Sequence, residues 1–200
     1  MNTKQTVERL RKLQTMLVEF GDIARMVHWP GKSSRRETDV EHSYSLAMLV
    51  WYLNDELSLK LDKQKLLEYA LVHDLVEVYA GDVSLFADQK HHDTKAEKEA
   101  ISVKQLGDEF GFFADMNRTL HNYEQRADQE AKFVYAVDKI QPAVMTTLGK
   151  TDTFQQDKIT IADYKAAHQR QTAKITGAFP DIEPLHQELI KMLSDHNFHD

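Results

Sequence analysis

The chain has 200 residues, including 7 glycines, 4 prolines and no cysteine, and its formal net charge is −7. This length suits one domain with a sizeable core, and the lack of cysteine excludes a disulfide framework and a thiolate metal site. The acidic balance argues against duplex nucleic acid as a partner. The N-terminus lacks the apolar core of a signal peptide, and the apolar run at residues 46–53 is too short to cross a membrane. We therefore expect a cytoplasmic protein with no membrane partner.

Apolar residues at spacings of three and four predict a helix over residues 4–27. Its inner face is made by Val7, Leu10, Leu13, Leu17, Phe20, Ile23 and Val27. Pro30-Gly31 ends this helix, and residues 28–39 are expected to form a polar, basic loop. A second helix follows, with Leu46, Ala47, Val50, Leu53 and Leu57 on its inner side.

Asp62 is a residue type that caps helix N-termini, so a third helix is expected to begin there and to end near Gly81-Asp82. Residues 81–94 form a polar segment long enough for a functional loop. Further helices are predicted at residues 95–110, 115–125, 128–148 and 160–177, and from Pro184 onward. Since no repeat or linker interrupts the chain, the prediction is all-α: a single helical bundle over residues 1–200, with the helices of residues 160–198 packed on the rest.

Polar residues interrupt three of the predicted inner faces. They are His42, His73, Asp74 and Asp138. Buried charges are costly without a partner of opposite charge, and a divalent metal ion is an effective partner. Two imidazoles and two carboxylates suit Mn, Co, Fe, Ni or Zn better than Mg or Ca. The alternatives are a solvated helix end around His73 and a hydrogen-bonded core carboxylate at Asp138.

The order H…HD…D is the signature of the HD-domain metal-dependent phosphohydrolases, and this sequence resembles them. Trp29-Pro30, residues 35–43, residues 73–82 and Asp138-Lys139 are similar to segments of the HD-domain 5′-deoxyribonucleotidases. Residues 123–134 resemble the branch that contains the HD-domain-containing protein 2. The resemblance covers about residues 10–148.

The resemblance implies roles for individual residues. One divalent metal ion would be bound by His42, His73, Asp74 and Asp138. Glu77 and Asp82 would be catalytic, and Asp82 would also line the sugar site. Trp29 would contact the substrate. The bacterial relatives have Arg immediately before this Trp, whereas this chain has His28, with Arg25 further back on the predicted helix. The relatives also suggest a homodimer.

The chemistry of these residues fits phosphate-ester hydrolysis. A bound metal ion lowers the pKa of its water and acts as a Lewis acid, and Glu77 can take or deliver a proton. Arg35, Arg36 and Lys32 are candidates for holding phosphate, the alternative being a solvated basic loop.

The sequence thus predicts a metal-dependent phosphomonoesterase for nucleotide substrates, most specifically a 5′-nucleotidase acting on deoxynucleoside monophosphates. One alternative is an HD-type phosphodiesterase or a hydrolase of alarmones or nucleotide pyrophosphates. Another is a regulatory protein that a metal only stabilises. His91 and His92 fall in a polar segment and are expected to be exposed, which disfavours a second metal ion. The remaining histidines of the C-terminal part are expected on polar or terminal segments, without function: His168, His186, His196 and His199.

Overall fold

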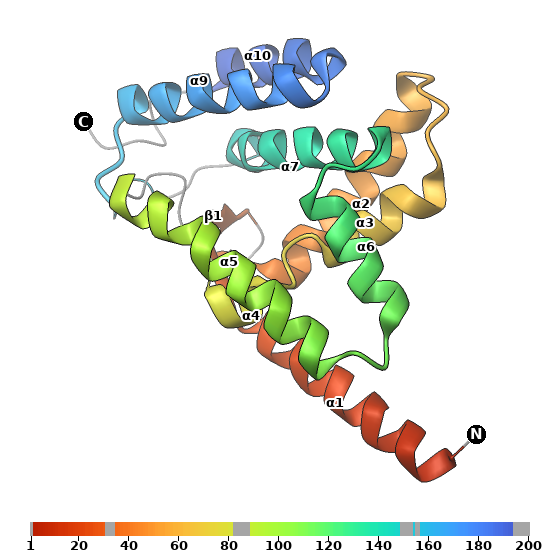
Figure 1. Cartoon of the computed structure of the whole chain (residues 1–200). Helices are drawn as coiled ribbons and strands as arrows, with labels where there is room; N and C mark the ends of the chain where they lie inside the picture. The colour runs from red at the N-terminus through yellow and green to blue at the C-terminus, as the bar shows by residue number, and fades with distance from the viewer. Residues whose placement is uncertain (1, 31–34, 82–88, 149–153, 155–156, 194–200) are drawn as a thin grey trace.

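The computed structural model describes residues 2–30, 35–81, 89–148, 154 and 157–193. Helices dominate this part of the chain, which confirms the predicted all-α class (Figure 1). They are α1 (Thr3–Gly21), α2 (Asp39–Glu56), α3 (Lys63–Val72), α4 (Glu77–Ala80), α5 (Gln89–Glu109), α6 (Ala114–Glu124), α7 (Gln129–Thr147), α9 (Ile161–Ala178), the 3-10 turn η1 (Pro180–Ile182) and α10 (Glu183–Met192). No helix among the described residues is long and apolar enough to cross a membrane.

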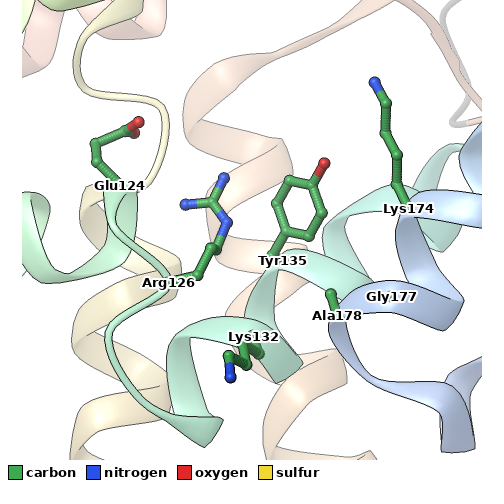
Figure 2. Close-up of a pocket in the computed structure, with 7 residues that line it drawn as sticks. All are labelled: Glu124, Arg126, Lys132, Tyr135, Lys174, Gly177 and Ala178. Carbon is green, nitrogen blue, oxygen red and sulfur yellow. The ribbon is translucent and has the colours of Figure 1, made fainter.

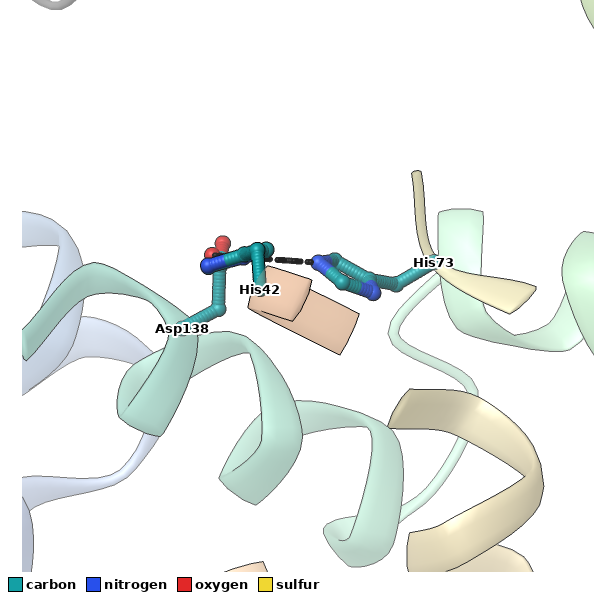
Figure 3. A group of neighbouring side chains, drawn as sticks. All are labelled: His42, His73 and Asp138. Carbon is teal, nitrogen blue, oxygen red and sulfur yellow. Dashed lines mark hydrogen bonds and ion pairs between the residues drawn. The ribbon is translucent and has the colours of Figure 1, made fainter. Parts of the chain in front are cut away.

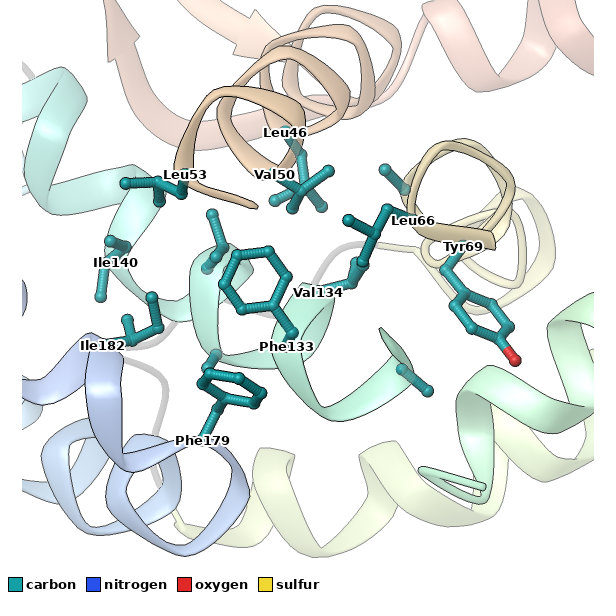
Figure 4. Close-up of a cluster of buried hydrophobic side chains, with 14 of the residues drawn as sticks. Leu46, Val50, Leu53, Leu66, Tyr69, Phe133, Val134, Ile140, Phe179 and Ile182 are labelled. Carbon is teal, nitrogen blue, oxygen red and sulfur yellow. The ribbon is translucent and has the colours of Figure 1, made fainter. Parts of the chain in front are cut away.

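Helix α7 lies at the centre of the fold, between α9 and α10 on one side and α2 and α3 on the other (Figure 1). The main core forms where these helices meet (Figure 4). Its members include Leu46, Val50, Leu66, Phe133, Val134, Ile140, Phe179 and Ile182. The rings of Phe133 and Phe179 meet edge to face, with centroids 5.0 Å apart, and so join α7 to the C-terminal helices.

A second core lies where α1, α4, α5 and α6 meet. It is built from Met16, Phe20, Val72, Leu75, Val76, Leu106, Phe110, Met116 and Leu120. The segment that carries His73 and Asp74 runs between the two cores, since Val72 and Leu75 belong to this second one while Leu66 and Ala70 belong to the first.

Two short strands replace the C-terminal part of the predicted first helix. Helix α1 ends at Gly21, and β1 (Ala24–Trp29) pairs antiparallel with β2 (Arg35–Thr38). The prediction of helix to residue 27 and of loop from residue 28 was therefore wrong. The spacing of Ile23 and Val27 suits a helix, but the N–H of Asp22 donates to the carbonyls of Glu19 and Phe20 and closes α1.

The predicted third helix is also interrupted. Helix α3 ends at Val72, residues 73–76 form a turn, and Glu77 opens the separate short helix α4. The carbonyl of Ala70, which would accept the Asp74 N–H in a continued α-helix, accepts from His73 Nδ1 at 2.9 Å. The N–H of Glu77 then bonds the carbonyl of Asp74 at 2.8 Å, which tightens the turn.

The C-terminal helices have the predicted boundaries but an unexpected inner face. Thr160 and Asp163 form the capping box that begins α9, and Pro184 lies in the first turn of α10. His168 and His186 are buried, contrary to the expectation of polar surface positions. The two imidazoles bond each other at 2.8 Å, so each provides a partner that a buried polar ring requires. His196 and His199 lie outside the described residues.

Candidate metal centre

Three segments deliver the four predicted ligands to one place. His42 lies in the first turn of α2, His73 and Asp74 lie in the turn after α3, and Asp138 lies on α7. The start of α2 is fixed by a capping box in which Thr38 and Glu41 bond each other's backbone N–H. His42, one residue later, is thereby directed into the core.

The potential ligand atoms converge closely (Figure 3). His42 Nε2 lies 3.2 Å from His73 Nε2 and 3.1 Å from Asp138 Oδ1. Asp74 Oδ2 lies 3.0 Å from His73 Nε2 and 3.7 Å from His42 Nε2. Bonds of about 2.0–2.2 Å to one metal ion place neighbouring ligand atoms roughly 3–3.6 Å apart. The observed spacings therefore fit a shared cation.

The tautomer of His73 decides what this cluster offers. His73 Nδ1 faces the carbonyl of Ala70, which can only accept, so Nδ1 carries the hydrogen. Its Nε2 faces Asp74 Oδ2 and His42 Nε2. Burial opposes protonation of His73, but the charge of Asp74 outweighs it and raises the pKa of His73, so without a metal ion this Nε2 holds a proton in an ion pair with Asp74, and a bound metal ion would take the place of that proton. Several electron-pair donors facing one point require a positive charge between them, which a proton on His73 or a metal ion supplies.

The electrostatics favour ionised carboxylates at this point. Burial opposes ionisation of Asp74, but His73 and Arg25 outweigh it and hold the pKa of Asp74 below its usual range. Burial likewise opposes ionisation of Asp138, and Lys139 and His42 hold its pKa well below the usual range. Burial lowers the pKa of His42 to about 4, so this imidazole is neutral at pH 7. Both carboxylates and His42 are thus in the protonation states that bind metal ions.

Behind His42 lies a carboxylate that the sequence did not single out. Glu37, on β2, is fully buried, and its Oε2 lies 3.7 Å from His42 Nδ1. The other oxygen accepts from Gln141 Nε2 at 2.9 Å. Burial raises the pKa of Glu37 to about 7, against the opposing charge of Arg25. Strand alternation places Glu37 inward, a signal that was hidden while residues 28–39 were taken for a loop.

A comparison with family models identifies the domain. Residues 23–182 match the model of the HD domain, a span that contains all four converging residues. The chain belongs to the HD domain family. Of its H…HD…D residues, His42, His73 and Asp138 offer ligand atoms that all lie within 4.8 Å of one another, and Asp74 Oδ2 lies 3.0 Å from His73 Nε2.

Curated relatives support this assignment. The human 5′-deoxynucleotidase HDDC2 is 28% identical over 136 residues, which cover 64% of this chain and 64% of the human protein. The Bos taurus 5′-deoxynucleotidase HDDC2 is 29% identical over 136 residues, 64% of this chain and 63% of that protein. The matched part thus spans less than two thirds of the length of these relatives.

The fold is shared with solved structures. A protein described as a predicted metal-dependent phosphohydrolase, from Magnetospirillum magnetotacticum MS-1, superposes with a TM-score of 0.70. The match covers 96% of this chain and 99% of that one, at 24% sequence identity. This likeness shows the HD domain fold over nearly the whole chain.

Arg25 belongs to the carboxylate network of this HD domain. The residue lies on β1, not on a helix as predicted, and its NH1 donates to Asp39 Oδ1 at 2.9 Å and to Asp74 Oδ2 at 2.7 Å. Its Nε lies 3.9 Å from Glu37 Oε2. Arg25 therefore compensates the negative charge on one side of the cluster.

Glu77 is buried beside the cluster. Its carboxylate, together with those of Asp39 and Asp74, forms a group whose oxygens lie within 4.8 Å of one another. Glu77 therefore lies beside Asp74 in a group of carboxylates that is distinct from the group of His42, His73 and Asp138. Asp82, the other predicted catalytic residue, lies outside the described residues.

The other predicted substrate residues lie on the hairpin of β1 and β2. Arg35 forms a two-pronged ion pair with Glu41 and lies over the ring of Trp29, 5.3 Å from its centroid. Arg36 bonds Asp157 at 2.9 Å. Within the described structure, neither arginine contacts the four converging residues. Lys32 and the side chains of His91 and His92 lie outside the described part.

Proposed function

We propose that this HD domain is a metal-dependent phosphohydrolase whose single divalent ion is held by His42, His73, Asp74 and Asp138. The observation that carries the proposal is the convergence of buried ligand atoms from His42, His73 and Asp138, all within 4.8 Å of one another, with Asp74 Oδ2 3.0 Å from His73 Nε2. The mixed nitrogen and oxygen set suits Mn, Co, Fe, Ni or Zn.

When bound, the metal ion supplies an activated water and neutralises charge on the phosphoryl oxygens. The residues around it have separate tasks. Glu37 orients the ring of His42 from behind. Arg25 keeps Asp74 ionised through the 2.7 Å bond to its Oδ2. Glu77 takes or delivers a proton at its carboxylate, since it is buried beside the site but is not required as a ligand.

The substrate class follows from the relatives. Curated proteins that resemble this chain are named 5′-deoxynucleotidases, so we infer that the substrates are deoxynucleoside 5′-monophosphates. Trp29 and Asp82 would contact the sugar, and Arg35 and Arg36 are the predicted phosphate residues. Their ion pairs with Glu41 and Asp157 would have to open for that role.

The test is a phosphate-release assay on purified protein loaded with each of the five metals. We expect release from deoxynucleoside 5′-monophosphates and none from cyclic nucleotides or nucleotide pyrophosphates. Equal turnover of dAMP and AMP would remove the deoxyribose preference but leave the phosphatase assignment. Absence of release with every metal, from protein shown to contain one ion per chain, would overturn the enzymatic proposal.

The organisation of the chain remains a prediction on two points. One domain over residues 1–200 is supported by the packing of α9 and α10 on α7. A homodimer rests only on the resemblance to relatives, and light scattering would test it.

A further inference from the structure

A basic cavity that the proposed chemistry does not use lies near the metal centre (Figure 2). Its volume is about 390 Å³, and it is formed by the end of α6, the turn that follows, α7 and α9. The lining residues are Glu124, Arg126, Lys132, Tyr135, Lys174, Gly177 and Ala178. Three cations around one cavity are unexpected in a chain of net charge −7.

Arg126 is held rigidly at this cavity. Its guanidinium carbon lies 4.3 Å from the ring centroid of Tyr123 and 4.2 Å from that of Tyr135. One of its N–H groups donates to the carbonyl of Tyr123, and its backbone has a φ of 49°. A non-glycine residue in this left-handed conformation is uncommon and marks a defined turn. Arg126 is therefore positioned by the fold before any ligand arrives.

This positioned guanidinium forms no ion pair inside the described structure. No described carboxylate lies within 4.0 Å of its nitrogens, although Glu124 lines the same cavity. Guanidinium groups held against aromatic rings keep their N–H edges for ligands, and those edges match phosphate oxygens. The charge of Arg126 does act on the carboxylate of Glu124 in the same cavity, where it opposes the rise that burial causes in the pKa of Glu124. Because no described carboxylate forms an ion pair with Arg126, its N–H edge remains open to an anion.

Other cations surround the same ring. Arg126 and Lys174 extend to the same side as the Tyr135 hydroxyl, whereas Lys132 extends to the opposite side in the same view (Figure 2). Lys139 lies one turn after Tyr135 on α7, with its ammonium 4.9 Å from the Tyr135 centroid. An anion above Tyr135 would thus meet positive charge from α7, α9 and the turn before α7.

Lys139 contacts both a residue that lines the cavity and a predicted metal ligand. The ammonium of Lys139 donates to Asp138 Oδ2 at 2.5 Å while lying over the Tyr135 ring. We propose that Arg126, Lys174 and the Tyr135 hydroxyl bind a phosphate group separate from the one hydrolysed at the metal. This inference rests on the proposed function and extends it. The phosphate is either a second phosphate of the nucleotide substrate or free inorganic phosphate.

Phosphate binding is tested directly on the metal-loaded protein by NMR of the arginine side chains. The Nε–H signal of Arg126 is assigned by its disappearance in Arg126→Gln, and inorganic phosphate is titrated. We expect a saturable shift whose apparent Kd rises about tenfold in Lys174→Gln. Lys132→Gln is the matched control, with the same charge change in the same cavity, and should leave the Kd within about twofold. No saturable shift, or equal weakening in both lysine variants, would overturn the subsite.

Steady-state kinetics then separates the two sources. If the group belongs to the substrate, Arg126→Gln should lower kcat/KM for a deoxynucleoside 3′,5′-bisphosphate about tenfold and leave the 5′-monophosphate unchanged. If it is free phosphate, both values should stay unchanged while inhibition by phosphate weakens. A loss for both substrates, with phosphate inhibition as in the wild type, would contradict the subsite. The NMR titration does not depend on turnover, so failure of the proposed enzymatic activity would leave it informative.

Discussion

Glu37 Oε2 lies 3.7 Å from His42 Nδ1, and both side chains are fully buried. Carboxylates behind metal-binding imidazoles fix the orientation of the ring and its tautomer. We expect Glu37→Gln to lower the metal affinity of the protein about 10–100-fold, the usual effect of removing such a partner. The affinity is measured by competition with a chelating dye.

The control for this change is Glu188→Gln, which removes an exposed carboxylate that pairs with Lys191 on α10. It should leave the metal affinity unchanged. If Glu37→Gln also binds metal as the wild type does, His42 is oriented by other groups.

Substitutions at Asp138 and at Glu77 should distinguish metal binding from proton transfer. Asp138→Ala removes a converging oxygen on α7, so we expect loss of the metal ion and of the stability linked to it. Glu77→Ala should keep the metal and a nearly unchanged Tm but lower kcat roughly 10²–10⁴-fold. Metal content, thermal melting and phosphate release are compared in one buffer. Loss of metal from Glu77→Ala would make Glu77 a ligand, whereas full activity would assign the proton transfer elsewhere.

Arg25 should act mainly on stability, although the sequence suggests a substrate residue. Arg25→Met removes the cation that bonds both Asp39 and Asp74, so we expect a loss of about 3–5 kcal/mol in the free energy of unfolding. Urea denaturation measures it. Arg35→Met, which breaks a more exposed and solvent-screened pair with Glu41, should cost much less. A raised KM with unchanged stability in Arg25→Met would restore the substrate role.

The residues that the sequence predicted best are those that break an apolar pattern. Asp138 interrupts the inner face of a long helix, and the structure buries it on α7 as expected. His42 follows the same logic in the first turn of α2. Helix periodicity indicates that such residues face inward, whereas their grouping into one site rests on the order H…HD…D and the family resemblance.

The residues that the sequence missed depend on tertiary pairing. Glu37 faces inward because β2 pairs with β1, and the polar segment around it gave no strand signal. The break after Val72 depends on the His73 ring taking the carbonyl of Ala70, a side-chain bond that periodicity does not encode. Neither local propensity nor spacing can reveal such contacts.

The buried imidazoles of His168 and His186 should make the free energy of unfolding depend on pH, independently of the metal centre. Their 2.8 Å bond joins α9 to α10, Thr172 Oγ1 lies 3.1 Å from His186 Nδ1, and the ring of Tyr164 stacks on His168 with centroids 4.3 Å apart. Burial lowers the pKa of His168 to about 3. Burial also lowers the pKa of His186, against the opposing charge of Glu183.

The direction of this pH dependence follows from proton uptake by the unfolded chain. An unfolded histidine has a pKa of about 6.5, so between about pH 6.5 and pH 3 the unfolded chain binds more protons at His168 than the folded one. The stabilisation is fully present above pH 6.5 and decreases as the pH falls, by up to about 1.4 kcal/mol per pH unit for one such group. We expect His168→Gln to reduce this loss, because a glutamine can bond His186 without titrating.

The measurement is the free energy of unfolding by urea at pH 7.5, 6.0 and 5.0, taken as the difference between wild type and variant. Acidic groups elsewhere and the metal ligands titrate alike in both proteins, so their contributions cancel in that difference. Between pH 6.0 and 5.0 the wild type should lose about 1 kcal/mol more than His168→Gln. His121→Gln, at an exposed position on α6, should follow the wild-type slope. Parallel slopes for wild type and His168→Gln would mean that His168 takes up its proton inside the folded protein, and that the contact between α9 and α10 tolerates the charge.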